Sequence, residues 1–385
     1  MIRKNWYQSF LSGLILIGIT TLLYLYSAGY RLTRSQENKT IDLSQTGMIS
    51  AKSIPEGSSV YLNGILLTAT NDTISGIEPG IHNIKIIKKG FVTWAKDIEV
   101  FSELVTDITA VLVSQSPRLE PLTNTGARNP TISSSLSKLA YFSKDGENSG
   151  IRIISLAGEG LSLFRSTPAT VLKDTPRIIY SNGKSIEWSP DEKNLLVEGE
   201  DGTFYLVDLG AEAATVTSSP EEIKKAWIDK LNKTRQDFIQ KLDIPEEIRN
   251  LATSINTLWS PDEKKFLYSR PNGQDLEYIV YNLEKPIPVG EKVENIAFTT
   301  KASDPQPRIT WYADSFHLIL TEGNIDTEKR GVVSLIRIDG TNKTELYNNT
   351  LMTDKVYSSP AGDKIIILTS FKSGEQTDLY TVSIR

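Results

Sequence analysis

The sequence predicts an all-β protein with one N-terminal transmembrane helix, a small β-sandwich, and a β-propeller of five or six blades that carries a helical insertion. Three observations support this prediction. An apolar stretch lies near the N-terminus, and a short region of alternating apolar and polar residues follows it. The string Trp-Ser-Pro-Asp-Glu-Lys then occurs twice, at Trp188–Lys193 and Trp259–Lys264. Repeats spaced by a few tens of residues indicate stacked supersecondary units.

Length and composition set the first limits. The 385 residues are enough for two or three domains, and 23% charged with 39% hydrophobic residues is typical of a folded chain. The formal net charge of −5 argues against a nucleic-acid partner, which would require a basic face. The chain has no cysteine, which excludes disulfides, thiolate catalysis and zinc–thiolate sites.

The apolar stretch Ser9–Tyr30 contains no charged side chain. About 20 apolar residues cross the roughly 30 Å hydrocarbon core of a bilayer, so this stretch is long enough to span it. It is longer than the apolar part of a signal peptide, and Ser27-Ala28-Gly29 is only a weak candidate for a cleavage site. We therefore expect an uncleaved signal-anchor helix over residues 9–30. A cleaved signal peptide and a buried core helix are the alternatives.

The flanking charges leave the orientation of this helix nearly undecided. Arg3 and Lys4 on one side are balanced by Arg31 and Arg34 on the other. A very short N-terminal tail before a large domain is usually placed N-in, C-out, so we expect residues 1–8 to be a cytoplasmic tail. The protein is then predicted to be single-pass in the cell membrane, with its bulk extracytoplasmic. The polar, aperiodic residues 31–46 are predicted to be a linker.

Residues 47–114 are predicted to form a small all-β domain, because apolar and polar residues alternate between turns rich in Gly, Pro and Asn. Its motifs have an order and spacing that resemble the PEGA family of surface-protein modules, with Ser58 where the family motif has Ala. The resemblance implies a compact β-sandwich of exported or surface-layer proteins, structural or adhesive in role and without catalytic residues. The residues that carry it are Pro55-Glu56-Gly57, Val60-Tyr61-Leu62-Asn63-Gly64, Pro79-Gly80-x-His82 and Gly90-Phe91-x-x-Trp94.

Residues 117–385 repeat a polar turn followed by an apolar strand and then a second strand. Units of about 45 residues with several strands each are typical of propeller blades, and the pattern resembles the blades of Tol-type and WD-like propellers. We expect the tryptophans to pack between blades rather than to bind a ligand. Extra strands within residues 116–129 or 161–179 would make six blades, so that number stays open, with five preferred. The five units align at Ile132, Trp188, Trp259, Trp311 and Ser358.

The longest interval between units is explained by residues 218–252, which have helical periodicity. Ser219, Pro220 and Glu222 predict a capping box with proline at the first helical position. A second short helix is predicted from Asp243. We expect a helical hairpin packed on the propeller rim, with docking of a partner as the alternative. Lys and Asp are expected opposite the apolar face, which comprises Ile223, Trp227, Leu231, Phe238 and Leu242.

Few residues suggest chemistry. The two histidines are both expected in structural positions, His82 in a PEGA-like strand and His317 at a solvent-exposed strand edge. The carboxylate pairs Asp191-Glu192 and Asp262-Glu263 lie in the repeated turns, and phosphate-binding and Gly-x-Ser-x-Gly motifs are absent. We therefore predict no catalytic residues, no cofactor-binding residues, no metal site and no cofactor.

Together these observations predict a non-enzymatic, membrane-anchored extracytoplasmic protein. Its PEGA-like spacer would present the propeller to a protein or glycan ligand of the cell envelope. One alternative is a propeller-type hydrolase or lyase acting on envelope glycans, which would require carboxylates converging at the channel mouth. The other is an envelope assembly or sensor factor that uses the helical insertion.

Overall fold

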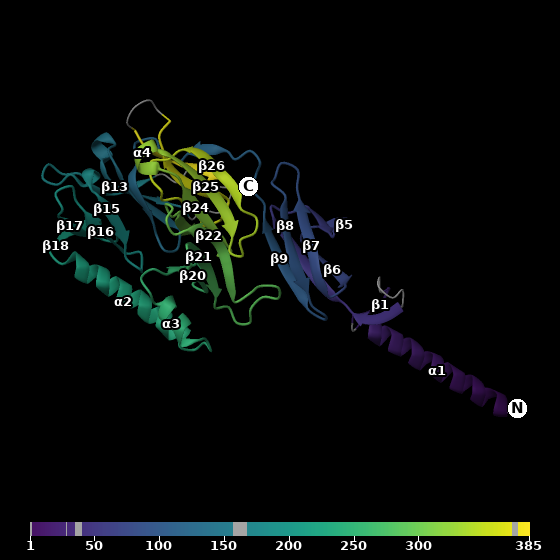
Figure 1. The fold of residues 1–385 in the computed structure, drawn as a ribbon. Coiled ribbons are helices and arrows are strands. Elements are labelled where there is room, and N and C mark those ends of the chain that lie inside the picture. The colour runs from purple at the N-terminus through teal and green to yellow at the C-terminus, as the bar shows by residue number, and fades with distance from the viewer. Residues whose placement is uncertain (1, 28, 35–40, 157–167, 372–375) are drawn as a thin grey trace. The chain divides into compact units, whose positions relative to one another are not determined.

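The protein is described from a computed structural model, which covers residues 2–27, 29–34, 41–156, 168–371 and 376–385. The chain forms two compact units (Figure 1). The first comprises Met1–Leu112 and Pro286–Lys292, and the second comprises Val113–Lys285 and Val293–Arg385.

The first element of the first unit is helix α1, Ile2–Ser27. Its apolar part, Ser9–Ser27, is 19 residues long and none of it is buried, which rules out a core helix. At 1.5 Å per residue this part is about 28 Å long, close to the thickness of a hydrocarbon core. It is an apolar helix of the kind that serves as a membrane anchor or as a signal peptide.

Residues after the helix form a hairpin instead of the expected aperiodic linker. Strands β1 (Tyr30–Arg34) and β2 (Ile41–Gln45) pair antiparallel, with Leu32 opposite Leu43. The hairpin returns the chain to the end of α1, because the backbone N and the Oγ1 of Thr46 both donate to the Gly29 carbonyl, at 3.0 and 2.8 Å.

The PEGA-like region is a β-sandwich of two sheets. One has the order β6 (Asp72–Ile77), β3 (Gly47–Ile54), β9 (Val105–Val111), with β3 and β9 parallel. The other has the order β5 (Ile65–Ala69), β4 (Ser59–Leu62), β7 (Gly80–Ile87), β8 (Trp94–Val100). Alternate residues of both sheets form the core, as the sequence pattern predicts, and they include Ile49, Val60, Leu62, Ile84, Ile86, Trp94, Ile98 and Ile108.

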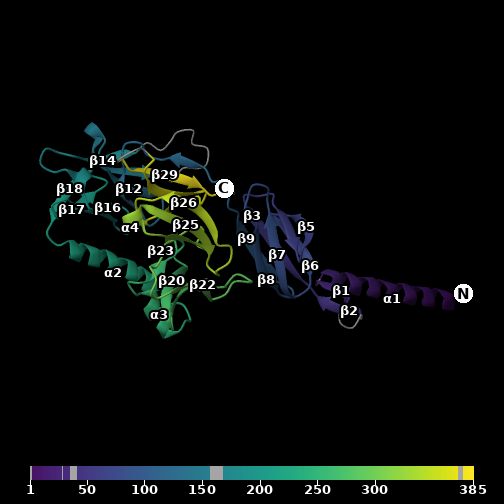
Figure 2. The same cartoon turned by 45° about the horizontal axis from the view of Figure 1, so that its top comes forward.

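The second unit is a propeller of five four-stranded antiparallel sheets within the described residues (Figures 1 and 2). Blade 1 contains β11 (Arg128–Ile132), β12 (Lys138–Ser143), β13 (Gly150–Ser155) and β14 (Ala169–Lys173). Blade 2 contains β15 (Ser185–Trp188), β16 (Asn194–Glu198), β17 (Phe204–Asp208) and β18 (Ala213–Thr217). Blade 3 contains β19 (Leu258–Trp259), β20 (Lys265–Asn272), β21 (Asp275–Asn282) and β22 (Glu294–Lys301).

Blade 4 contains β23 (Arg308–Trp311), β24 (His317–Glu322), β25 (Arg330–Arg337) and β26 (Thr344–Thr350). Blade 5 contains β27 (Tyr357–Ser358), β28 (Lys364–Thr369) and β29 (Asp378–Ser383), with β10 (Leu119–Pro121) as its fourth strand. Short helical turns complete the unit: η1 (Gly146–Asn148), η2 (Tyr180–Asn182) and α4 (Ile325–Glu328).

The ring is closed by β10, which precedes the first blade in sequence but pairs with β29 in the last, Leu119 opposite Val382 and Pro121 opposite Tyr380. Residues 116–129 therefore supply a closing strand and the start of β11. Of residues 161–179, the part up to 167 lies outside the described residues, and β14 completes blade 1. Within the residues that the structure describes, the propeller therefore has five blades, the smaller of the two predicted numbers. Apolar clusters fill the spaces between blades 1 and 2, 3 and 4, and 5 and 1.

Candidate binding face

The turn between the first and second strands has the same geometry in all five blades. The backbone N–H of its first residue donates to the carbonyl five residues later, and the residue three positions along has a positive φ of 55 to 60°. This matches the alignment made from the sequence, since each aligned residue directly precedes the turn. The first residues of the five turns are Ser133, Ser189, Ser260, Tyr312 and Ser359.

Two of the three tryptophans before these turns join neighbouring blades, as predicted. Trp188 Nε1 donates to the Thr131 carbonyl of blade 1 at 3.2 Å, and Trp311 Nε1 donates to the Leu258 carbonyl of blade 3 at 2.9 Å. Trp259 differs, because its Nε1 donates to the carbonyl of Ala252, the last residue of a helix in the insertion, at 2.8 Å. The insertion therefore takes the place that a preceding blade has elsewhere.

Adjacent turns are also linked to one another. Ser135 N donates to Glu192 Oε1 at 2.7 Å between blades 1 and 2. Asp262 N donates to Ser315 Oγ at 3.1 Å between blades 3 and 4, and Ala313 N donates to Ser358 Oγ at 3.2 Å between blades 4 and 5. Between blades 2 and 3 the turns are linked by side chains of a helix of the insertion, described next.

The insertion consists of α2 (Pro220–Ile239) and α3 (Glu246–Ala252). Both helices pack on blade 3, as expected, with Ile239 and Ile248 buried beside Phe266. Pro220 is the first residue of α2, but the Ser219 hydroxyl makes no capping hydrogen bond, so the predicted capping box does not form. The backbone of Ser219, with ψ at 59°, is not extended as an N-cap residue usually is.

Cationic side chains of α2 form ion pairs with both blade 2 and blade 3. Lys224 Nζ lies 2.8 Å from Glu187 Oε1 and Lys230 Nζ lies 3.2 Å from Asp191 Oδ2, both on blade 2. Arg235 pairs with Glu263 of blade 3 at 3.0 Å, and its guanidinium lies 4.9 Å from the centre of the Trp259 ring. Sequence reasoning placed lysines opposite the apolar face, but long cationic stems at the flank of a helix reach back toward the surface on which it packs.

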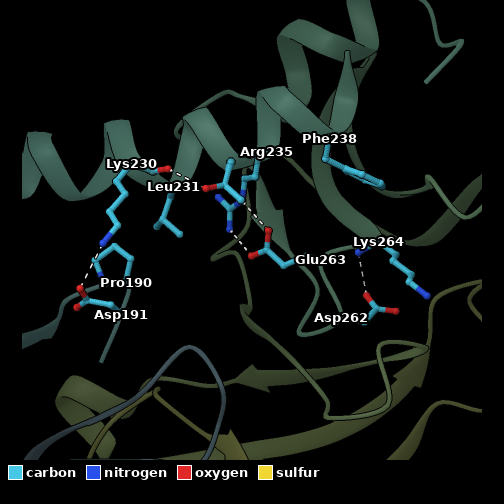
Figure 3. Close-up of a pocket in the computed structure, with 10 residues that line it drawn as sticks. Pro190, Asp191, Lys230, Leu231, Arg235, Phe238, Asp262, Glu263 and Lys264 are labelled. Atoms are coloured by element: carbon cyan, nitrogen blue, oxygen red, sulfur yellow. Dashed lines mark hydrogen bonds and ion pairs between the residues drawn. The ribbon is translucent and has the colours of Figure 1, made fainter. Parts of the chain in front are cut away.

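A groove of about 490 Å³ lies between α2 and the two Trp-Ser-Pro-Asp-Glu-Lys turns (Figure 3). Leu231 extends from α2 toward the turns, and the ion pairs of Lys230 and Arg235 lie along the helix. Apolar groups and paired charges therefore share one concave surface. It is lined by Pro190, Asp191, Lys230, Leu231, Thr234, Arg235, Phe238, Asp262, Glu263 and Lys264.

Two carboxylates of the groove, those of Asp191 and Asp262, are held ionised. Hydrogen bonds from Ser189 Oγ and Lys230 lower the pKa of Asp191 to about 2. Burial alone would raise the pKa of Asp262, but hydrogen bonds from Ser260 and Lys264 and the charge of Lys265 outweigh it, so that pKa is also lowered. A general acid at neutral pH requires a raised pKa, so these two groups suit the recognition of charge rather than proton transfer.

We expect the turn of blade 3 to lose stability in acid. Because the pKa of Asp262 is lower in the folded chain than the ordinary value of 3.8 for an aspartate, the ionised carboxylate stabilises the fold above that value. That contribution disappears as the pH falls through the lowered pKa. Thermal unfolding of Asp262→Asn at a series of pH values checks this. The midpoint of the variant should lie below that of the unchanged protein at neutral pH and approach it in acid, whereas a constant difference would contradict the assignment.

The two histidines lie in different units. His82 bonds to Asn63 Nδ2 and the Glu78 carbonyl, in a structural position as expected. His317 is not at a solvent-exposed edge, because it is 2% exposed and its Nδ1 lies 2.7 Å from Asp314 Oδ2. The side chain folds back on the aspartate of its own turn, as Lys265 does on Asp262 at 3.1 Å. Among the described residues, no group of three or more His, Asp or Glu side chains is arranged to hold a metal ion.

Comparison with known proteins identifies one family within the chain. The model of the PEGA domain matches residues 46–116, so the β-sandwich is a PEGA domain. No curated protein matches the chain in sequence.

Solved structures with some similarity include two TolB proteins and a lyase. TolB from Acinetobacter baumannii is 14% identical, with 78% of this chain and 59% of that chain covered and a TM-score of 0.26. The putative TolB from Agrobacterium tumefaciens is 16% identical, with 66% and 79% covered and a TM-score of 0.24. The oligogalacturonate lyase from Vibrio parahaemolyticus is 9% identical, with 79% and 86% covered and a TM-score of 0.32. At these levels the propeller assignment rests on the sheet order of the chain itself.

Proposed function

We propose that this chain is a non-enzymatic, membrane-anchored extracytoplasmic protein whose propeller binds a protein of the cell envelope. The PEGA domain is its spacer, and the groove under α2 is its binding site. The observation that carries this proposal is the placement of α2 across two turns of identical sequence. In that position the helix adds a concave surface with paired charges to the propeller face.

The lining of the groove favours a polypeptide segment as the ligand. Pro190, Leu231 and Phe238 offer an apolar surface of the kind that receives a hydrophobic side chain. The ion pairs around them supply polar partners for a peptide backbone and for charged residues on either side. The ionised carboxylates of Asp191 and Asp262 favour binding over glycoside hydrolysis at this groove, because hydrolysis requires a protonated acid beside a free carboxylate.

Site-specific photo-crosslinking in intact cells tests the groove. A photoreactive residue in place of Thr234, which lines the groove, should give a discrete adduct with one envelope protein. The same residue in place of Lys233, exposed and next to it on α2, is the matched control and should not give that adduct. Identical adduct patterns at the two positions would remove the groove from consideration.

The topology is tested with a tag after Arg385. In spheroplasts we expect protease added from outside to digest the tag, because the anchor is predicted to be N-in, C-out. Protection of the tag until lysis would place the propeller in the cytoplasm and overturn the extracytoplasmic proposal. A cytoplasmic marker protein measured in the same samples shows that the spheroplasts stay intact.

A further inference from the structure

One end of the PEGA domain is fixed to the end of α1. Strand β3 begins there at Gly47, directly after Thr46 has bonded to the Gly29 carbonyl. Glu103 N donates to the Thr46 carbonyl at 3.1 Å, so the loop between β8 and β9 lies at the same end. We call this the anchor end.

Strand register places several exposed apolar side chains at the anchor end. Ile81 follows Gly80, which pairs with Val100 just before the β8–β9 loop, and it is 78% exposed. Leu104 accepts a backbone hydrogen bond from Met48 N and is 47% exposed.

The turn between β4 and β5 reaches the same end. Asn63 N donates to the Asn83 carbonyl at 2.8 Å, close to the start of β7. Ile65, which follows this turn, is 66% exposed. Three separate turns therefore bring large apolar side chains to the end of the domain where the apolar helix stops.

The length of the helix sets how far these side chains are from lipid. The apolar part of α1 ends at Ser27, two residues before Gly29. If this part fills the hydrocarbon core, Gly29 lies in the interfacial layer, which is several ångströms thick on each side of the core. The hydrogen bonds between Thr46 and Gly29 then hold the anchor end at the membrane surface rather than at the end of an extended linker.

We propose that the anchor end of the PEGA domain rests on the lipid surface, with Ile65, Ile81 and Leu104 in the interfacial layer of the bilayer that α1 crosses. This inference rests on the membrane anchor of the proposed function. Moving exposed apolar surface from water into the interface is favourable, and the covalent tether removes most of the entropic cost of the encounter. The contact is apolar in origin, since the exposed Glu78 and Glu103 at the same end oppose the attraction of Arg31 and Arg34, which follow α1, for anionic lipid.

The absence of cysteine from the chain makes a direct test possible. The full chain with Ile81→Cys carries an environment-sensitive fluorophore and is reconstituted into phosphatidylcholine vesicles that contain a headgroup spin-labelled lipid. We expect the emission to shift to shorter wavelength and to be quenched by the spin label. The matched control is Lys89→Cys, an exposed position at the opposite end of the domain, since Ile87 pairs with Ser59 there. Its emission should show neither effect.

A second labelled position and a second lipid test whether the contact involves the whole anchor end and whether it depends on lipid charge. Leu104→Cys should behave like Ile81→Cys, and added phosphatidylglycerol should not increase the quenching at either position. Equal quenching at Ile81 and Lys89 would overturn the inference. Flotation of the same vesicles after alkaline washing tests the membrane anchor independently of the contact between the PEGA domain and the lipid surface. Protein that floats but shows a water-exposed probe at Ile81 contradicts only the surface contact, whereas protein that is washed off contradicts the anchor as well.

Discussion

Lys265→Ala is expected to lower the free energy of unfolding by about 4 kcal/mol, because it leaves the half-buried carboxylate of Glu284 without its partner. Lys265 is fully buried, and its Nζ lies 3.0 Å from Glu284 Oε1 and 3.1 Å from Asp262 Oδ2. The other oxygen of Glu284, Oε2, is buried without a hydrogen-bond partner. The ammonium also lies 4.1 Å from the centre of the Phe316 ring of blade 4. Urea denaturation followed by tryptophan fluorescence measures the loss.

Two further variants separate charge from volume at this site. Lys265→Met keeps most of the volume and should lose nearly as much stability as Lys265→Ala. Lys265→Met combined with Glu284→Gln removes one of the two carboxylate charges that lose their partner, and it should recover part of the loss. If Lys265→Met is as stable as the unchanged protein, the ion pairs of Lys265 do not contribute to the stability of the fold.

Asp378→Ala is expected to lower the free energy of unfolding of the propeller by about 3 kcal/mol, because it breaks the joint that closes the ring. Asp378 is 4% exposed, and its Oδ1 accepts from Thr123 Oγ1 at 2.9 Å and from Gly126 N at 3.0 Å. Its Oδ2 accepts from Gln376 Nε2 at 2.8 Å. Alanine leaves these donors without an acceptor in a largely buried place. The same denaturation experiment measures the change.

Asp378→Asn is the matched control for ring closure. The amide keeps an oxygen for Thr123 and Gly126 and loses only the acceptor for Gln376, so its loss should be clearly smaller. Equal losses for the two variants would show that the negative charge, rather than the hydrogen bonds across the closing strand, is the important property. Limited proteolysis at the start of the propeller should increase for Asp378→Ala and not for Asp378→Asn.

Much of the fold was predictable because its signals are local. The turn after Trp188 and Trp259 depends on residues within six positions, so two clear copies were enough to align the weaker units at Ile132 and Ser358. The alternation of Val60, Leu62, Ile84 and Ile86 predicted which side chains form the core of the sandwich. The helical insertion was recognisable because its period differs from that of the strands around it.

The features that escaped prediction depend on partners far away in the sequence or on side-chain direction. Strand β10 has only three residues, and its assignment to blade 5 requires the pairing of Glu120 with Thr381. The burial of His317 follows from the direction in which its side chain turns toward Asp314. The groove requires α2 to lie across Asp191 and Glu263, and helical periodicity predicts a face without saying what that face covers.

The closing strand also sets the order in which the propeller can be completed. Glu120 and Thr381 are 261 residues apart in the chain, so a ribosome working at about 5–20 residues per second makes the second partner tens of seconds after the first. Until then blade 5 is unfinished, and β10 has no sheet to join. The incomplete propeller therefore exposes unpaired strand edges that can pair with other chains. Until β10 joins β29, the closed ring cannot protect these edges from aggregation.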